Sequence, residues 1–219
     1  MGFSIRSAGT NHSRVSDSST GGASVRVAGV WKDGKVLYER VSGVWKIFHS
    51  PDPLVPSSDV SESGFEDTTG GDGDGVLWDE VSDGSLSTYL YSTLTGAGTN
   101  YARFNLPDAG VPHTLDQTVR LSVKCRPITT STHNAFLNVK LYQGVTLVDG
   151  DSDGLTAQFT LTPAMSGVDQ AFSYDLTSTE RSDLSPWTSM DLRLEHVVTS
   201  VALDTYHLRV YAAKLFIDF

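Results

Sequence analysis

The sequence predicts an all-β protein whose main part is an antiparallel β-sandwich or jelly roll. Three observations lead to this fold class. Apolar and polar residues alternate in several separate runs after residue 57. The runs are separated by Gly, Asp, Asn and Pro, the residue types that form turns. Only one stretch, Ser178–Leu184, carries the signals of a helix. Strands with one apolar and one polar face indicate antiparallel sheets that pack on each other.

Composition narrows the classes of protein that the chain can represent. Its 219 residues are enough to bury a core, and 39% of them are hydrophobic. The formal net charge of −10 argues against general nucleic-acid binding, which needs clustered cations. We find no apolar run near the roughly 18–20 residues that a membrane helix requires. The polar N-terminus also lacks the apolar segment of a signal peptide.

The first 56 residues differ in composition from the rest. Residues 1–24 are rich in Ser, Thr, Gly and Asn, which predicts a flexible arm. In residues 25–56, Val27–Lys32 recurs fourteen residues later as Val41–Lys46, and Asp33-Gly34 is a hairpin-turn signal. We expect a small β-meander here, which needs a partner to bury its apolar surface.

Trp31 and Trp45 occupy equivalent positions in this repeat. Paired Trp residues in so small a module most often form its core. The alternative is that they anchor a partner or line a sugar or peptide site. Three prolines between His49 and Ser58 then indicate a linker, with the domain boundary near residue 56 and the sandwich at 57–219.

About eight strands are expected in the sandwich, beginning with 86–91 and 101–106. The two are joined by the Gly-rich loop Thr95–Asn100. The apolar positions of the later strands, expected to face the core, are Val119, Leu121, Val123 and Cys125; Ala135, Leu137, Val139 and Leu141; Ala157, Phe159 and Leu161; Phe172, Tyr174 and Leu176; Met190, Leu192, Leu194 and His196; Leu208, Val210 and Ala212, then Leu215 and Ile217.

Two local features add detail. The apolar phase of the last strand shifts near Ala213-Lys214, which suggests a β-bulge. Thr177 and Glu180 have the spacing of a capping box, and Pro186 would end the short helix that follows Thr177.

A calcium site is the sharpest candidate among the short motifs. Asp149, Asp151 and Asp153 match the first half of a calcium-binding loop, in which spaced carboxylates converge on the cation. The twelfth position is Thr160, which cannot supply the bidentate carboxylate. Because the motif lies between two expected strands, a solvated hairpin loop is the favoured interpretation. The acidic stretch Glu66–Gly75 is likewise interpreted as a mobile loop, since it occurs only once.

No catalytic motif is present in the sequence. Cys125 is in phase with a core face, which predicts a buried structural thiol, and a single cysteine excludes an internal disulfide. The six histidines do not form zinc-binding pairs, and His196 is expected to be a hydrogen-bonded core residue. We therefore expect no enzyme activity and no cofactor. A carboxylate pair of a glycosidase stays open, because its separation is a three-dimensional quantity.

The stretch Val76–Leu106 carries a resemblance to a known family. It begins with Leu77-Trp78 and Glu80, continues through a polar turn to Tyr89-Leu90, and ends at Leu106-Pro107. Thr88 replaces the usual Asp before the Tyr. We interpret Trp78–Glu80 as an entry strand with a buried Trp. Later matching segments are Val119–Cys125, Leu141–Gly144 and Asp183–Leu194, and the Gly-x-Trp-Lys repeat also fits. In these features the chain resembles virion proteins of tailed bacteriophages.

The resemblance implies a non-enzymatic β-sandwich, made in the host cytoplasm and displayed on a virion. We expect a capsid decoration or head-fibre subunit, anchored by its N-terminal region to other virion proteins and assembled as a homo-oligomer such as a trimer. The alternative is a tail-associated protein whose sandwich binds host glycan. The aromatic residues available for that role are Trp78, Trp187, Tyr89 and Tyr91.

Overall fold

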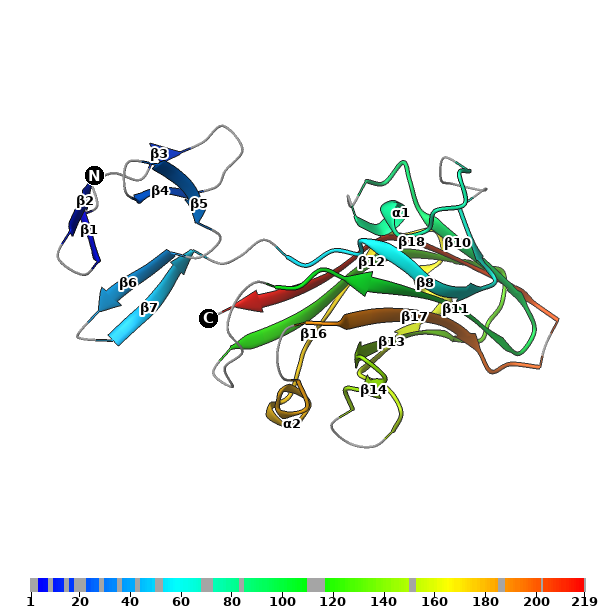
Figure 1. The fold of residues 1–219 in the computed structure, drawn as a ribbon. Coiled ribbons are helices and arrows are strands. Elements are labelled where there is room, and N and C mark those ends of the chain that lie inside the picture. Colours follow the sequence, from blue (N-terminus) through cyan, green and yellow to red (C-terminus); the bar gives the residue numbers. More distant parts are fainter. Residues whose placement is uncertain are drawn as a thin grey trace. The chain divides into compact units, whose positions relative to one another are not determined.

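The computed structural model describes residues 53–67, 73–82, 85–109, 117–149, 153–184, 188–201 and 203–218, together with the backbone of seven strands before residue 50 (Figure 1). The chain divides into two compact units, and the second spans Pro53–Ile217. No helix in the described part is long and apolar enough to cross a membrane.

Short antiparallel hairpins make up the N-terminal unit, including the segment in which the sequence predicted a flexible arm. Here, β1 pairs with β2, β4 lies between β3 and β5, and β6 pairs with β7. The bounds are β1 Ser4–Ser7, β2 Thr10–Ser13, β3 Ser16–Asp17, β4 Ala23–Val27, β5 Val30–Gly34, β6 Leu37–Val41 and β7 Val44–His49.

The sequence repeat corresponds to a repeated hairpin. Val27 pairs with Val30, and Val41 pairs with Val44 at the equivalent place. The predicted turn at Asp33-Gly34 is wrong, because both residues belong to β5 and pair with β4. Asp-Gly is a turn signal, but the two-residue connections of these hairpins follow Val27 and Val41 instead. The side chains of Trp31 and Trp45 lie outside the described residues.

Two antiparallel sheets pack as a β-sandwich in the second unit, which confirms the predicted all-β fold class (Figure 1). We call them the β12–β18 sheet and the β11–β17 sheet. The β12–β18 sheet has the order β16 (Gln170–Asp175), β12 (Thr118–Thr129), β18 (Thr205–Asp218), β10 (Leu90–Thr95) and β9 (Phe65–Glu66). The β11–β17 sheet has the order β14 (Thr146–Leu147), β13 (Ala135–Gln143), β17 (Met190–Val198), β11 (Gly98–Leu106) and β8 (Ser58–Ser63), and β15 (Ala157–Leu161) also pairs with β13.

The core consists of the apolar half of each alternating run. All four predicted core residues of β12 and all four of β13 are buried. In β18 the buried aliphatic residues have even numbers up to Ala212 and odd numbers from Ala213, so the predicted phase shift is present, and Tyr211 is buried as well. In β15 and β16, which lie at sheet edges, Phe159, Phe172 and Tyr174 are only half-buried. Phe159 and Phe172 stack on each other with ring centroids 4.8 Å apart.

The start of the opening stretch differs from the predicted entry strand. Asp79–Ser82 form a short helix, α1, and the strand predicted at 86–91 is β10, which begins only at Leu90. Acidic residues in a first turn suit the positive end of the helix dipole, so two adjacent carboxylates favour a helix start here. The residues buried at this place are Leu77, Glu80 and Val81, whereas Trp78 is half-buried.

The second short helix, α2 (Ser178–Ser182), begins as predicted. The Thr177 hydroxyl accepts a hydrogen bond from the Glu180 backbone N–H at 3.2 Å, and the Glu180 carboxylate accepts one from the Thr177 N–H at 2.6 Å. These two bonds complete the capping box.

Replacing Thr177 with Ala is expected to lower the free energy of unfolding by about 1 kcal/mol, because one helix N–H loses its acceptor. Urea denaturation measures the change. Thr179→Ala, an exposed substitution in the same helix, is the matched control and should cost much less. Equal losses in the two variants would contradict the capping role.

A buried polar chain joins the two sheets beside the turn from β10 to β11. The Ser92 hydroxyl lies 2.9 Å from His196 Nδ1, and Asn100 Nδ2 donates to Ser92 Oγ at 3.0 Å. Asn100 Nδ2 also lies 3.0 Å from the Gly64 carbonyl and 2.9 Å from the Thr93 carbonyl. His196 is therefore the hydrogen-bonded core residue that the sequence predicted.

Candidate functional site

The aspartates of the predicted calcium loop serve as turn acceptors. The Asp149 carboxylate accepts a hydrogen bond from the Gly154 N–H at 2.7 Å, and that of Asp153 accepts one from the Leu155 N–H at 2.8 Å. Such bonds are typical of aspartate in tight turns. Asp151 lies outside the described residues. Within the described ranges, no group of three or more His, Cys, Asp or Glu side chains is placed to hold a metal ion.

The second acidic stretch follows the same pattern at both of its described ends. Asp67 accepts from the Gly75 N–H and Asp74 from the Val76 N–H, each at 2.7 Å. Residues 68–72 lie outside the described part. In the described part of this stretch, Asp67 and Asp74 therefore hold the loop backbone in place.

Cys125 is fully buried in β12, as predicted. Burial raises the pKa of its thiol to about 12, and the nearby Asp169 carboxylate adds to the effect. A thiolate is the nucleophilic form of cysteine, so this side chain is not a reactive group in the folded protein.

The predicted sugar-binding aromatics are only partly brought together. Tyr89 and Tyr91 meet edge to face on the outer side of the β12–β18 sheet, with ring centroids 6.4 Å apart. Trp78 directly precedes α1, and Trp187 lies outside the described residues. Of these four aromatics, the structure therefore brings Tyr89 and Tyr91 together.

The most organised polar surface lies on the other sheet. The strands β11, β17 and β13 are neighbours (Figure 1). Their outward side chains alternate with the buried core residues. We call this surface the polar face. Its members are Tyr101, Arg103 and Asn105 of β11; Asp191, Arg193 and Glu195 of β17; and Asn138, Lys140 and Tyr142 of β13.

One half of the polar face is centred on Asp191. Arg103 donates to its carboxylate from Nη2 at 2.7 Å and from Nε at 3.1 Å, and Asn105 Nδ2 donates at 3.1 Å. The Arg103 guanidinium also lies over the ring of Tyr142, with its Cζ 4.3 Å from the centroid. Arg103 is thus fixed in place by a carboxylate and an aromatic ring.

The other half is centred on Glu195, which is only 5% exposed. Lys140 Nζ and Arg193 Nε lie 3.0 and 2.8 Å from its Oε1. The Arg193 guanidinium covers the ring of Tyr101, with its Cζ 3.8 Å from the centroid. Each half therefore combines a carboxylate, an arginine and a tyrosine.

The amide groups extend this surface to the sheet edge. Gln158 of β15 donates from Nε2 to the Asn138 Oδ1 at 3.0 Å. Tyrosine, arginine, carboxylate and amide groups lie on adjacent strands, about 4.8 Å apart. The polar face can therefore offer several donors and acceptors at once to a ligand with many hydroxyl groups, on side chains that are already ordered.

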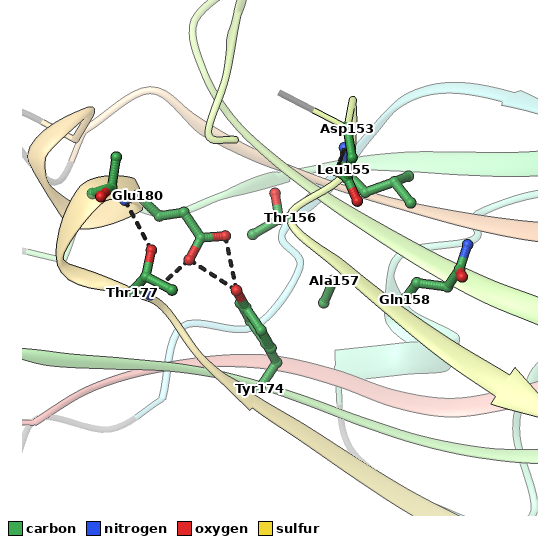
Figure 2. Close-up of a pocket in the computed structure, with 9 residues that line it drawn as sticks. Asp153, Leu155, Thr156, Ala157, Gln158, Tyr174, Thr177 and Glu180 are labelled. Carbon is green, nitrogen blue, oxygen red and sulfur yellow. Dashed lines mark hydrogen bonds between the residues drawn. The ribbon is translucent and has the colours of Figure 1, made fainter. Parts of the chain in front are cut away.

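A cavity of about 300 Å³ lies between β15 and α2 (Figure 2). Tyr174 points toward Glu180, and its hydroxyl lies 3.1 and 3.0 Å from the two carboxylate oxygens (Figure 2). The same carboxylate accepts the Thr177 N–H of the capping box. Because the buried acid of this cavity is already used to hold α2, the cavity is a less favourable ligand site than the polar face.

Sequence reasoning missed the polar face. Its residues are the outward half of strands whose inward half was predicted, and the alternation of Tyr101, Arg103 and Asn105 was available as a signal. Which outward residues become neighbours depends on strand pairing, and Arg103 and Asp191 are 88 positions apart.

Comparisons with known proteins found structures of low similarity. No protein-family model and no curated protein matches the sequence. A CBM4 protein has a TM-score of 0.38 and 14% identity, covering 62% of this chain and 87% of its own. The CBM22-1 xylan-binding domain of Paenibacillus barcinonensis Xyn10C has a TM-score of 0.41 and 12% identity, with 75% and 88% covered.

SGBP-B from a complex xyloglucan utilization locus of Bacteroides uniformis has a TM-score of 0.41 and 9% identity, covering 98% of this chain and 65% of its own. Likeness at this level does not transfer a function.

Proposed function

We propose that the β-sandwich is a non-enzymatic glycan-binding module and that the polar face holds the glycan. The observation that carries the proposal is the paired arrangement of tyrosine, arginine and carboxylate on neighbouring strands of one sheet face. Arg103 joins Tyr142 to Asp191, and Arg193 joins Tyr101 to Glu195.

Sugars suit this surface for two physical reasons. Neighbouring hydroxyls of a sugar can bridge the donors and acceptors of arginine, carboxylate and amide groups, while its C–H face packs on aromatic rings. The ion pairs also order these side chains before a ligand arrives, so less conformational entropy is lost on binding.

A binding role fits the carboxylates better than catalysis does. Asp191 receives two hydrogen bonds from Arg103, and Glu195 lies beside two cations. Asp191 stays partly exposed and can accept a further hydrogen bond from a ligand, whereas the nearly buried Glu195 holds Arg193 and Lys140 in place.

Placement on a tailed-bacteriophage virion is also part of the proposal, and the sequence resemblance supports it. A glycan-binding sandwich agrees better with the tail-associated alternative than with a capsid decoration or head-fibre subunit. Immunogold labelling of intact particles separates these placements. Deleting residues 1–50 and measuring binding to purified particles tests the N-terminal region as the anchor, and undiminished binding would reject that role.

Replacing Arg103 with Ala is expected to weaken glycan binding by about tenfold, equivalent to about 1.4 kcal/mol. The change removes the donor to Asp191 and the cation over Tyr142. A glycan array identifies the ligand, and isothermal titration calorimetry measures its affinity for each variant. Tyr142→Phe, which keeps the ring under Arg103, tests whether the hydroxyl contributes.

Arg120→Ala is the matched control. Arg120 also forms an ion pair, with Asp175 at 2.6 Å, but it lies on the other sheet. We expect this variant to bind the glycan as the unmodified protein does. An array without any bound glycan, or equal affinities for Arg103→Ala and the control, would reject the proposal.

A further inference from the structure

The outer face of the β12–β18 sheet carries more cations than carboxylates. No residue of β12 is acidic, and none of β18 is acidic from Thr205 to Ile217; the last residue of β18 is Asp218. We call this surface the basic face. Its outward cations are Arg120, Lys124 and Arg126 of β12 and Arg209 and Lys214 of β18.

This concentration of positive charge occurs in a chain with a net charge of −10. Charges farther apart than about 8 Å are largely screened at physiological ionic strength, so a ligand on this sheet responds mainly to the local cations. The polar face on the other sheet provides the contrast, because each of its cations lies beside Asp191 or Glu195.

Among the side chains that the structure describes, the carboxylates of the basic face lie at its two edges. Asp175 pairs with Arg120 and Asp169 with Arg126 at one edge, and Glu66 pairs across from Tyr91 at the other. In the centre, Lys124, Arg209 and Lys214 form no ion pair within the described residues. The buried Nε of Arg209 also has no hydrogen-bond partner there.

An aromatic cluster adjoins these cations. Tyr89 contacts Tyr211 edge to face at 5.6 Å, and Tyr91 stacks on His207 at 5.4 Å. The Arg209 guanidinium lies over the Tyr89 ring, with its Cζ 4.6 Å from the centroid. Partial burial and the charge of Arg209 lower the pKa of His207, and the permanent positive charges of this face are those of Lys and Arg.

We propose that the basic face binds an acidic polysaccharide, whose carboxylate or sulfate groups pair with Lys124, Arg209 and Lys214. Its sugar rings pack against Tyr89 and Tyr91, which are half-buried, whereas Tyr211 is buried beneath them. Guanidinium groups match planar carboxylates and sulfates with two parallel hydrogen bonds. This second site lies on the opposite sheet from the polar face and does not depend on the function proposed there.

An acidic peptide fits this surface less well than a polysaccharide. Extended peptides usually bind by adding a strand at a sheet edge, where backbone groups are free. The central strands β12 and β18 each have a neighbour on both sides, so their backbone groups already pair within the sheet. The side chains that remain are cations and aromatic rings, which suit a chain of charged sugars.

The test measures binding of the full chain to polygalacturonate and heparin, with dextran as the neutral comparison. We expect both acidic polymers to bind, with an affinity that falls as salt rises, and dextran not to bind at this face. The double variant Lys124→Ala/Arg209→Ala should weaken binding of the acidic polymers by at least about tenfold.

Two control variants separate this site from general charge effects. Lys35→Ala removes a cation from the N-terminal unit and should leave binding of the acidic polymers unchanged. Arg103→Ala should impair only the ligand of the polar face. Thermal unfolding of each variant shows whether it is folded.

Three results would overturn the proposal. They are no binding of either acidic polymer, equal binding by the double variant and the unmodified protein, or polyglutamate binding as tightly as polygalacturonate. The last result would indicate attraction to any polyanion. None of the three bears on the ligand of the polar face, so the two proposals fail separately.

Discussion

Replacing Gly64 with Ala is expected to lower the free energy of unfolding by about 3 kcal/mol, the sum of backbone strain and lost hydrogen bonds. Gly64 has a φ of +74°, which L-residues rarely adopt. An added Cβ would lie 2.2 to 2.7 Å from the Asn100 side-chain atoms. Asn100 would have to move away from Ser92, breaking the polar chain that joins the sheets.

Gly167→Ala is the matched control for this substitution. Gly167 has nearly the same φ, +76°, but a Cβ there would meet no atom within 4 Å. It should therefore cost only the backbone strain, about 1–2 kcal/mol. Urea denaturation of the two variants measures the difference, and equal losses would show that the Asn100 contact does not matter.

A double variant isolates the contact further. In an Asn100→Ala background, Gly64→Ala should cost no more than Gly167→Ala, because the clashing side chain is gone. The coupling energy from this cycle reports the close approach of Gly64 and Asn100 directly. No sequence pattern marks this pair, since the two residues lie 36 positions apart.

Strands that bury one face were predictable from sequence. In β12 and β13 every second residue is apolar, and β17 follows the same pattern except at His196; burial of that half is the main driving force for the sheet to form there. The strand β8 has six exposed residues and therefore no alternation to detect. It forms because β11 offers a free edge, a condition set by the rest of the fold.

The two short helices also differ in whether local sequence or the rest of the fold determines them. The capping box of Thr177 and Glu180 is a local interaction between residues three apart, so the sequence identified it. Trp78–Glu80 also had local signals, but an apolar residue followed by two acids fits a strand entry or a helix start equally well. Leu77 and Val81 pack into the core, and this packing favours the helix α1 over a strand.

The candidate sites depend on strand pairing, which alternation does not encode. Alternation places Arg103, Asp191 and Tyr142 on outward faces, yet only the register brings Asn105 opposite Asp191 and Asp191 opposite Tyr142. The aromatics predicted for glycan binding show the same limit. Tyr89 and Tyr91 gain His207 and Tyr211 as neighbours only because β10 pairs with β18.

Stability is expected to fall as the pH is lowered from 7 to 5, and His196 is the principal cause. Burial lowers the pKa of His196 from 6.5 to about 3 in the folded protein, and the charge of His207 acts in the same direction. Below pH 6.5 the unfolded chain therefore binds a proton that the folded protein does not. At pH 5 this difference amounts to about 2 kcal/mol, at 1.36 kcal/mol per pH unit.

His196→Asn tests this cause, because an amide can keep the hydrogen bond to Ser92 but does not titrate. The variant should be less stable at pH 7 and lose much of the fall in unfolding free energy between pH 7 and 5. His133→Asn, at a 57% exposed side chain, should retain that fall. In the unmodified protein, NMR should show no titration of the His196 ring between pH 7 and 5. A ring that titrates near pH 6.5 would overturn the explanation, since it would bind its proton equally in both states.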